Sequence, residues 1–421
     1  MRIIESSNRR AVGPLVDRGQ DTDPAVVRRV AQIVAAVRRS GDTAVLRYAR
    51  QFDQLLSPVE VTGEEMQDGL RAVAPQLRSA LRRAATHIRR VARRQVPRGW
   101  RSAVTAGVEI EQRVTPLDRV GCYVPAGRYP LPSSLLMTVI PARVAGVPEV
   151  VVVCPRPDTT VLAAAAIAGA TQLFRLGGAH AVAALAYGTA TVPKVDKIVG
   201  PGSAYVAAAK ALVAADCPID FYAGPTEIVI IATGGEPAWI AADLLAQAEH
   251  DASAQAILVT DDAAFADATL EAVERHLKVL PRADIAYASW RDYGAVIVVP
   301  ALADAVALID RIAPEHLALA IENAEEIAFR VRNAGAIFLG RHTPEALGDY
   351  VAGPNHVLPT GGSARFSSGL GVFDFIKRTS LIGCDASGLR TLGPAAITLA
   401  EAEGLHAHAL SVAIRLRADE G

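Results

Sequence analysis

The chain has 421 residues, of which 51% are hydrophobic and 21% charged, a composition typical of a globular protein with room for two or three domains. Its 43 basic and 44 acidic side chains leave a formal net charge of −1, so no overall field favours nucleic acid or an anionic membrane as a partner. The four cysteines are far apart and form no CxxC pair, which favours free thiols in a reducing compartment over a disulfide framework.

The first ten residues, MRIIESSNRR, contain no apolar signal-peptide core. Apolar runs such as Val150–Cys154 are much shorter than the ~20 residues that a bilayer requires. We therefore expect a soluble, cytoplasmic protein with no membrane partner.

From residue 1 to about 110 the sequence predicts mainly helices, and Thr22-Asp23-Pro24 is typical of a helix start. Residues 71–101 carry ten arginines and no acid. An apolar stripe runs through this segment at helical spacing, so we expect its arginines to face solvent or another subunit. RNA binding is the alternative, and the near-zero net charge disfavours it. The stripe consists of Leu77, Leu81, Ala84, Ile88 and Val91.

Short apolar strands alternate with alanine-rich helices from about residue 115. This alternation predicts an α/β fold with a parallel sheet covered on both faces, and the unit recurs after Pro225. The expected strands are 119–124, 149–154, 172–176, 197–199, 227–232, 256–260 and 294–299. The expected helices are 133–145, 160–169, 179–187, 204–214, 237–250 and 263–279. In the last 60 or so residues we expect turns, a helix at Pro394–Glu403 and a short terminal strand, which together are too sparse to form a core.

No GxGxxG fingerprint is present. Two turns between a strand and a helix, Gly177–His180 and Gly200–Ser203, could cradle a pyrophosphate with their backbone N–H groups. Each is equally typical of a tight βα turn.

Gln247 and His250 lie at positions i and i+3 of one expected helix, so both can reach a metal ion. A polar helix end is the alternative interpretation. Further ligand-type side chains lie in turn-rich segments, namely Asp349, His356, Glu403, His406 and His408.

Glu315 and His316 follow Pro314 and offer two proton carriers of different intrinsic pKa. The same residues are also typical of a capped helix start. We interpret the pair together with the histidines as a metal or acid–base site.

A series of sequence blocks then resembles the histidinol dehydrogenase family from about residue 20 to the end of the chain. The blocks are GCYVPAG at 121–127, GGAHAVAALAYG at 177–188, PKVDKIVGPGSAY at 193–205, AGPTE at 223–227, AADLLAQAEH at 241–250, APEHL at 313–317, NAGAIFLG at 333–340, PEALGDYVAGPNHVLPT at 344–360, FDFIKR at 373–378 and AEAEGLHAH at 400–408.

The resemblance implies one Zn²⁺ per subunit and an acid–base pair formed by Glu315 and His316. It also implies substrate contacts from the zinc ligands and His316, together with Thr226, His356 and Glu403. The implied zinc ligands are Gln247, His250, Asp349 and His408.

For NAD, the resemblance implies contacts at Tyr123, His180 and Ser203. Tyr123 matches the family pattern, whereas His180 and Ser203 replace a Gln and an Asn, and Thr226 replaces a Ser. We expect these changes to alter the affinity for the coenzyme.

The implied fold has two similar, incomplete Rossmann-like parallel-sheet domains in an intertwined homodimer with shared active sites. We expect an N-terminal arm at 1–15, a discontinuous domain at 16–120 and 228–370 that holds the zinc and acid–base residues, an NAD-binding domain at 121–227 and a tail at 371–421 that contributes to the partner's site.

The implied reaction is the oxidation of L-histidinol to L-histidine through L-histidinal with two NAD⁺, the last steps of histidine biosynthesis. Two alternatives remain open. One is a related zinc- and NAD-dependent enzyme that oxidises another small alcohol, such as a sulfonated diol. The other is a non-catalytic or RNA-binding protein that uses the arginine-rich segment.

Overall fold

The computed structural model describes residues 3–16, 23–125, 130–222 and 224–418. Thr22 of the expected helix start and parts of two sequence blocks therefore lie outside the described residues. Contacts divide the chain into a first unit, residues 1–95 with 118–375, and a second unit, residues 96–117 with 376–421. No helix in the described ranges is long and apolar enough to cross a membrane.

A five-stranded sheet in the order β2-β7-β6-β5-β8 forms one half of the first unit. Four of its strands are parallel, β5 (Arg119–Tyr123), β6 (Glu149–Val153), β7 (Gln172–Phe174) and β8 (Lys197–Val199), while the edge strand β2 (Glu60–Val61) is antiparallel. Helices α2 (Pro24–Tyr48), α7 (Gly178–Tyr187) and α8 (Ala204–Val213) share a core with one face. Helix α5 (Pro132–Ala145) packs on strands β5 and β6, with α4 (Pro75–Gln95) and α6 (Thr159–Ala168) beside it, and α3 (Gly63–Ala72) packs against α6.

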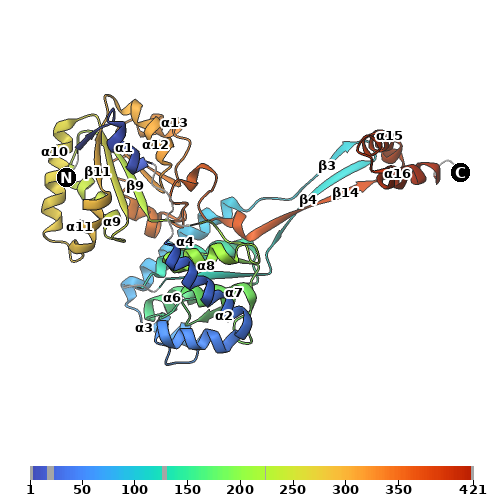
Figure 1. Ribbon diagram of the computed structural model, residues 1–421, viewed down its shortest axis with the longest axis horizontal. Helices are drawn as coiled ribbons and strands as arrows, with labels where there is room; N and C mark the ends of the chain where they lie inside the picture. Colours follow the sequence, from blue (N-terminus) through green and yellow to red (C-terminus); the bar gives the residue numbers. More distant parts are fainter. Residues whose placement is uncertain (1–2, 17–22, 126–129, 223, 419–421) are drawn as a thin grey trace. The chain divides into compact units, whose positions relative to one another are not determined.

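A six-stranded parallel sheet in the order β1-β11-β10-β9-β12-β13 forms the other half. Its strands are β1 (Ile3–Glu5), β9 (Glu227–Ala232), β10 (Gln255–Thr260), β11 (Ala295–Val298), β12 (His316–Ala320) and β13 (Ala336–Leu339). Helices α9 (Pro237–Ala248), α10 (Ala263–Leu277) and α11 (Ala283–Tyr293) cover one face, and α1 (Arg9–Val16), α12 (Ala305–Ile312) and α13 (Ala324–Arg330) cover the other (Figure 1).

Strand β9 shows why these sheets read as continuous apolar runs. Ile228 and Ile230 belong to the core on the α9 face, whereas Val229 and Ile231 belong to the core on the α12 face. Because successive side chains of a strand point to opposite faces, a strand buried on both faces requires an apolar residue at every position.

Several short elements connect the regular ones in the first unit. They are η1 (Ala49–Asp53), η2 (Leu302–Asp304), α14 (Glu345–Leu347), η3 (Gly348–Ala352), η4 (Ser363–Arg365) and η5 (Val372–Phe375).

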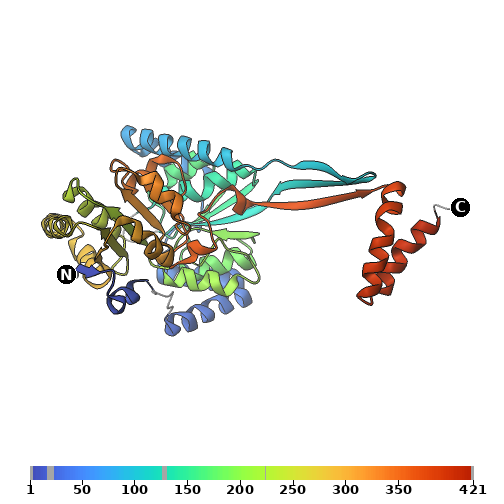
Figure 2. The ribbon, with the colours of Figure 1, turned by 90° about the horizontal axis from the view of Figure 1, so that it is seen from above.

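The second unit consists of an antiparallel sheet and two helices. Strands β3 (Trp100–Thr105), β4 (Val108–Pro116) and β14 (Ile376–Cys384) pair in the order β14-β4-β3. The long strands lead into helices α15 (Ala386–Ala402) and α16 (His406–Ala418), which pack against each other (Figure 2). The β3–β4 turn contacts the start of α15, where the backbone N–H of Asp385 donates to the carbonyl oxygen of Gly107 over 2.9 Å.

The predicted α/β class with two parallel sheets is confirmed, and so is the start of α2, where Asp23 caps the helix and Pro24 begins it. Three local predictions are wrong. Residues 100–105 and 108–110 form strands rather than helices, the last described element is the helix α16 rather than a strand, and α15 begins at Ala386 with Pro394 inside it. Short amphipathic segments satisfy helix and strand patterns alike, so their pairing partners decide between the two.

The predicted grouping of residues 16–120 with 228–370 also differs from the packing. The apolar stripe of α2, formed by Val30, Ile33, Val34 and Val37, packs in the core of the five-stranded sheet. By contrast, β1 from the predicted arm joins the six-stranded sheet beside β11, and residues 96–117 belong to the second unit. An apolar stripe requires an apolar surface but does not specify which one, because hydrophobic attraction is not directional.

The arginine-rich segment forms α4, as predicted. Leu81, Ala84 and Ile88 of the predicted stripe are buried, although Leu77 is 38% exposed. Packing of this apolar stripe within the first unit explains the amphipathic pattern of the segment.

Candidate active site

The predicted acid–base pair lies where β12 begins, beside the start of the neighbouring strand β9. Parallel pairing sets His316 opposite Ile228, so Thr226 and Glu227 lie next to Glu315. The carboxylate of Glu315 accepts hydrogen bonds from Thr226 Oγ1 over 2.6 Å and from the backbone N–H of Glu227 over 3.1 Å. His316 begins a strand and Glu315 directly precedes it, so the helix-start interpretation is wrong.

His316 is buried and has two different surroundings at its two ring nitrogens. Nδ1 lies 3.2 Å from the carbonyl oxygen of Glu227 and 3.0 Å from Oε1 of Glu345. Nε2 is buried without a hydrogen-bond partner among the residues that the structure describes, and lies 3.9 Å from a carboxylate oxygen of Asp349. Such an unsatisfied nitrogen is available to a ligand.

Burial shifts the pKa values of both members of the pair. Desolvation raises the pKa of Glu315 well above its usual value, against the hydrogen bonds from Thr226 and Glu227 that lower it. Desolvation lowers the pKa of His316 to about 3, and the nearby charges of His250 and His356 add to the effect. At neutral pH this environment favours the uncharged imidazole of His316.

Gln247, His250 and Asp349, three of the four predicted zinc ligands, gather around His316. Gln247 is buried in the last turn of α9, and its amide lies 2.7 Å from Thr226 Oγ1. With its nitrogen facing Glu345, the same amide donates to that carboxylate over 2.7 Å. His250 lies two residues beyond the end of α9, so the pair spans the helix end rather than sharing one helical face.

His250, His356 and Asp349 lie near His316 and near one another. The charge of His250 lowers the pKa of both His316 and His356, and desolvation lowers the pKa of His250 itself. His356 Nδ1 lies 2.8 Å from the backbone carbonyl oxygen of Asp349. Desolvation raises the pKa of Asp349 to about 6.

His408 and Glu403 belong to the second unit. Glu403 follows the last residue of α15, His408 lies in the first turn of α16, and both are exposed. The structure therefore assembles Gln247, His250, Asp349, His356 and Thr226 in the first unit, and carries these two residues on the other.

Glu345 is a buried site residue that the sequence interpretation missed. It begins α14, and its carboxylate forms the closest ion-pair contact of His316. His316, Glu345 and Asp349 have ligand atoms within 4.8 Å of one another, the arrangement of a possible metal site among the described residues. The predicted zinc set shares only Asp349 with this group.

The predicted coenzyme residues lie at the carboxyl edge of the five-stranded sheet. Tyr123 ends β5, and its hydroxyl accepts from the backbone N–H of Gly178 over 2.9 Å. Strand β5 pairs with β6 on one side and β8 on the other, so Tyr123 and the Gly200 turn lie at the point where the strand order reverses. Open α/β sheets bind ligands at this point.

His180 is turned away from solvent, with an exposed fraction of 1%. Its Nε2 lies 2.8 Å from Oδ2 of Asp53, which also accepts from the backbone N–H of Gly177 over 2.9 Å. Ser203 caps α8 and is exposed. Of the two residues that replace the family's Gln and Asn, only Ser203 is open to solvent.

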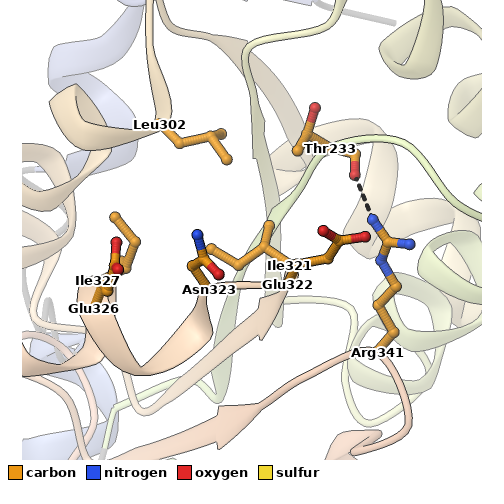
Figure 3. Close-up of a pocket in the computed structure, with 8 residues that line it drawn as sticks. All are labelled: Thr233, Leu302, Ile321, Glu322, Asn323, Glu326, Ile327 and Arg341. Carbon is orange, nitrogen blue, oxygen red and sulfur yellow. Dashed lines mark hydrogen bonds between the residues drawn. The ribbon is translucent and has the colours of Figure 1, made fainter.

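A pocket of about 420 Å³ lies at the opposite ends of β9 and β12 from the acid–base pair. In Figure 3, Arg341 donates to the carbonyl oxygen of Thr233, over 3.2 Å, with Glu322 and Ile321 nearby. None of the predicted site residues lines this pocket, so it is separate from the candidate active site.

Comparisons with known proteins identify relatives over the whole length of the chain. Residues 16–416 match the family model described as histidinol dehydrogenase. The chain is 53% identical over 428 residues to histidinol dehydrogenase of Rhizobium meliloti (strain 1021), covering 100% of this chain and 99% of the relative. It is 55% identical over 395 residues to that of Mesorhizobium japonicum, covering 92% of each. The crystal structure of histidinol dehydrogenase from Elizabethkingia anophelis superposes with a TM-score of 0.94 at 34% identity, covering 100% of this chain and 98% of that one.

Proposed function

Because the chain belongs to the histidinol dehydrogenase family, we propose that it oxidises L-histidinol to L-histidine through L-histidinal, using two NAD⁺. The reaction would complete histidine biosynthesis in the cytoplasm. The observation that carries the proposal is the buried, unpaired Nε2 of His316, next to Glu315 and facing Asp349.

We assign the proton transfers to the pair at the start of β12. His316, neutral because of its burial, takes the proton of the substrate alcohol at Nε2. Glu315, held by Thr226 and the Glu227 backbone, then activates water at the aldehyde carbon. Two successive oxidations require both groups near one carbon atom, and adjacent residues satisfy this requirement.

The residues in the first unit fit a zinc ion. Gln247, His250 and Asp349 offer an amide oxygen, an imidazole nitrogen and a carboxylate oxygen, donors that suit Zn²⁺. His408 would be the fourth ligand. When bound, the ion would orient the imidazole and amine of the substrate. His356 and Glu403 complete the proposed substrate contacts.

For the coenzyme, we propose that Tyr123 and the turns at Gly177 and Gly200 bind NAD at the carboxyl edge of the five-stranded sheet. The backbone N–H groups of glycine turns at helix starts favour a pyrophosphate. Ser203 adds an exposed hydroxyl there, and His180 acts through Asp53, which holds the turn at Gly177.

We also propose a homodimer in which the second unit serves the site of the partner subunit. Glu403 and His408 are exposed on that unit. Its two helices and the turn between them carry exposed apolar side chains that a partner would cover, namely Leu392, Leu399, Leu405, Leu410 and Ile414.

Stoichiometry tests the reaction. Purified protein with zinc should produce two NADH per L-histidinol consumed, and one equivalent, or turnover of sulfonated diols only, would refute the proposal. Metal analysis tests the ligands, because His408→Ala should lose zinc whereas His316→Ala should keep it.

Complementation between two inactive variants tests the shared site. In a mixed dimer of His316→Ala and His408→Ala subunits, one of the two sites receives both intact residues. We expect mixing and reassembly to restore activity, whereas a tail that serves its own subunit would leave the mixture inactive.

A further inference from the structure

Glu345 contacts the proposed base from the side opposite to the unpaired nitrogen. It is 4% exposed, and its Oε1 lies 3.0 Å from Nδ1 of His316. We propose that Glu345 is a positioning residue: it accepts the hydrogen bond of Nδ1–H and thereby keeps Nε2 of His316 unprotonated and aimed at the reacting hydroxyl. This inference rests on the proposed role of His316 as the base.

The carbonyl oxygen of Glu227 decides which nitrogen carries the proton. It lies 3.2 Å from Nδ1, and a carbonyl oxygen can only accept. Nδ1 must therefore carry the hydrogen, and its neighbours Glu227 and Glu345 share it as acceptors. In a neutral imidazole the other nitrogen, Nε2, then holds the free lone pair.

Glu345 rather than Glu315 is the acceptor that fits. The nearest oxygen of Glu315 lies 3.8 Å from Nδ1, beyond hydrogen-bond distance, and that oxygen already accepts from Thr226 and Glu227. The two buried carboxyl groups beside the imidazole, those of Glu315 and Glu345, thus have different roles. Glu315 remains available for the aldehyde step, while Glu345 holds the ring.

The role does not depend on the ionisation of Glu345. Burial raises its pKa well above the usual value, yet a carboxylic acid keeps one oxygen that accepts. Gln247 donates to the same carboxyl group over 2.7 Å, which fixes its orientation from the other side.

A double-mutant cycle with His316 tests the proposal. Glu345→Ala should lower kcat by on the order of 10²–10⁴-fold, the range seen when the residue that orients a catalytic histidine is altered. KM and zinc content should change less than about threefold, because Gln247 keeps its hydrogen bond with Thr226 when the carboxyl group is removed. In the His316→Ala background the same substitution should have no further effect on kcat, since the contact proposed to set kcat is the one to that ring.

Two further variants separate this role from a structural one. Glu345→Gln keeps a carbonyl oxygen that can accept from Nδ1–H, so it should regain at least tenfold of the activity lost in Glu345→Ala. It also serves as the folded reference if the alanine variant is unstable by thermal unfolding. Glu326→Ala, on the exposed face of α13, is the matched control and should retain wild-type kcat.

Several outcomes would overturn the inference. These are an equal loss of kcat in both backgrounds, a loss of zinc in proportion to activity, or a rise in KM with kcat unchanged. Failure of the proposed function is distinguishable, because it would appear in the wild-type protein as no turnover of histidinol. If another alcohol were the substrate, the same cycle measured with that alcohol would still decide the role of Glu345.

Discussion

Lys210 and Asp220 form an ion pair beneath the Gly200 turn, and replacing Lys210 with methionine tests how that turn is held. The two side chains are 4% and 1% exposed. Lys210 Nζ also donates to the carbonyl oxygen of Gly200 over 2.9 Å, and Asp220 accepts from the backbone N–H of the same residue over 2.7 Å. Both polar groups of Gly200 therefore depend on this pair.

The expected loss follows from what remains after the substitution. Lys210→Met leaves the Asp220 carboxylate buried with two backbone N–H donors, those of Gly200 and Phe221. Breaking a buried pair by removing one partner costs about 3–5 kcal/mol, and because the two donors remain we expect the lower end, about 3 kcal/mol. We also expect a raised KM for NAD⁺, since the turn belongs to the proposed coenzyme site.

Urea unfolding followed by circular dichroism measures the loss. The matched control is Lys197→Met in the same half of the first unit, whose partner Asp374 lies 2.8 Å away in a pair with exposed fractions of 16% and 25%. Exposure should limit that loss to about 1 kcal/mol or less. Adding Asp220→Asn to Lys210→Met should recover about 1–2 kcal/mol, because the buried charge is removed. Equal losses in the two methionine variants, or a loss below about 1 kcal/mol in Lys210→Met, would refute the reasoning.

Three further outcomes are expected. Gly200→Ala should lower the free energy of unfolding by at least about 2 kcal/mol in thermal unfolding, because φ is +111° and an added Cβ would lie 2.2 Å from the carbonyl oxygen of Tyr123. The control Gly234→Ala, with φ +59° but open space around the added Cβ, should lower it by only about 1 kcal/mol. Burial raises the pKa of Asp243 to about 6, so the native state binds this proton more tightly than the unfolded state and loses stability as pH rises from about 4 to 6. Asp243→Asn should therefore be more stable than wild type by on the order of 2 kcal/mol at pH 7.5 and equal to it near pH 4. A stability difference of the same size at both pH values would contradict this. A thiol reagent should label Cys384 alone in the native protein, and Cys384→Ser should abolish that fast reaction, because burial raises the pKa of the other thiols to about 12, 12 and 11 at Cys122, Cys154 and Cys217.

Strands buried on both faces were predictable from local sequence. Runs such as Glu149–Val153 and Glu227–Ala232 are apolar at nearly every position, and glycine or proline flanks them. These signals lie within a few residues of one another, so no knowledge of distant partners is required.

The attachment of the N-terminal helices was not predictable. The stripe of α2 fits any apolar surface of suitable shape, and only tertiary packing assigns it to the five-stranded sheet. The strands β3 and β4 were not predictable either, since β3 pairs with β4, and β4 pairs with β14, which comes more than 250 residues later in the chain.

In the candidate site, too, some features were predictable from the sequence and others were not. Sequence blocks alone selected Glu315, His316, Gln247, His250 and Asp349, and the structure brings these residues close together. Nothing in the local sequence indicates that Glu345 bonds to His316 or that His180 turns to Asp53.

The sequence by itself therefore determined the class of the fold and the residue types of the site, because both are encoded by neighbours along the chain. The tertiary structure alone decided which ring nitrogen of His316 is free. That choice depends on a carbonyl oxygen and a carboxylate from separate elements, which come within hydrogen-bond distance only after the chain has folded.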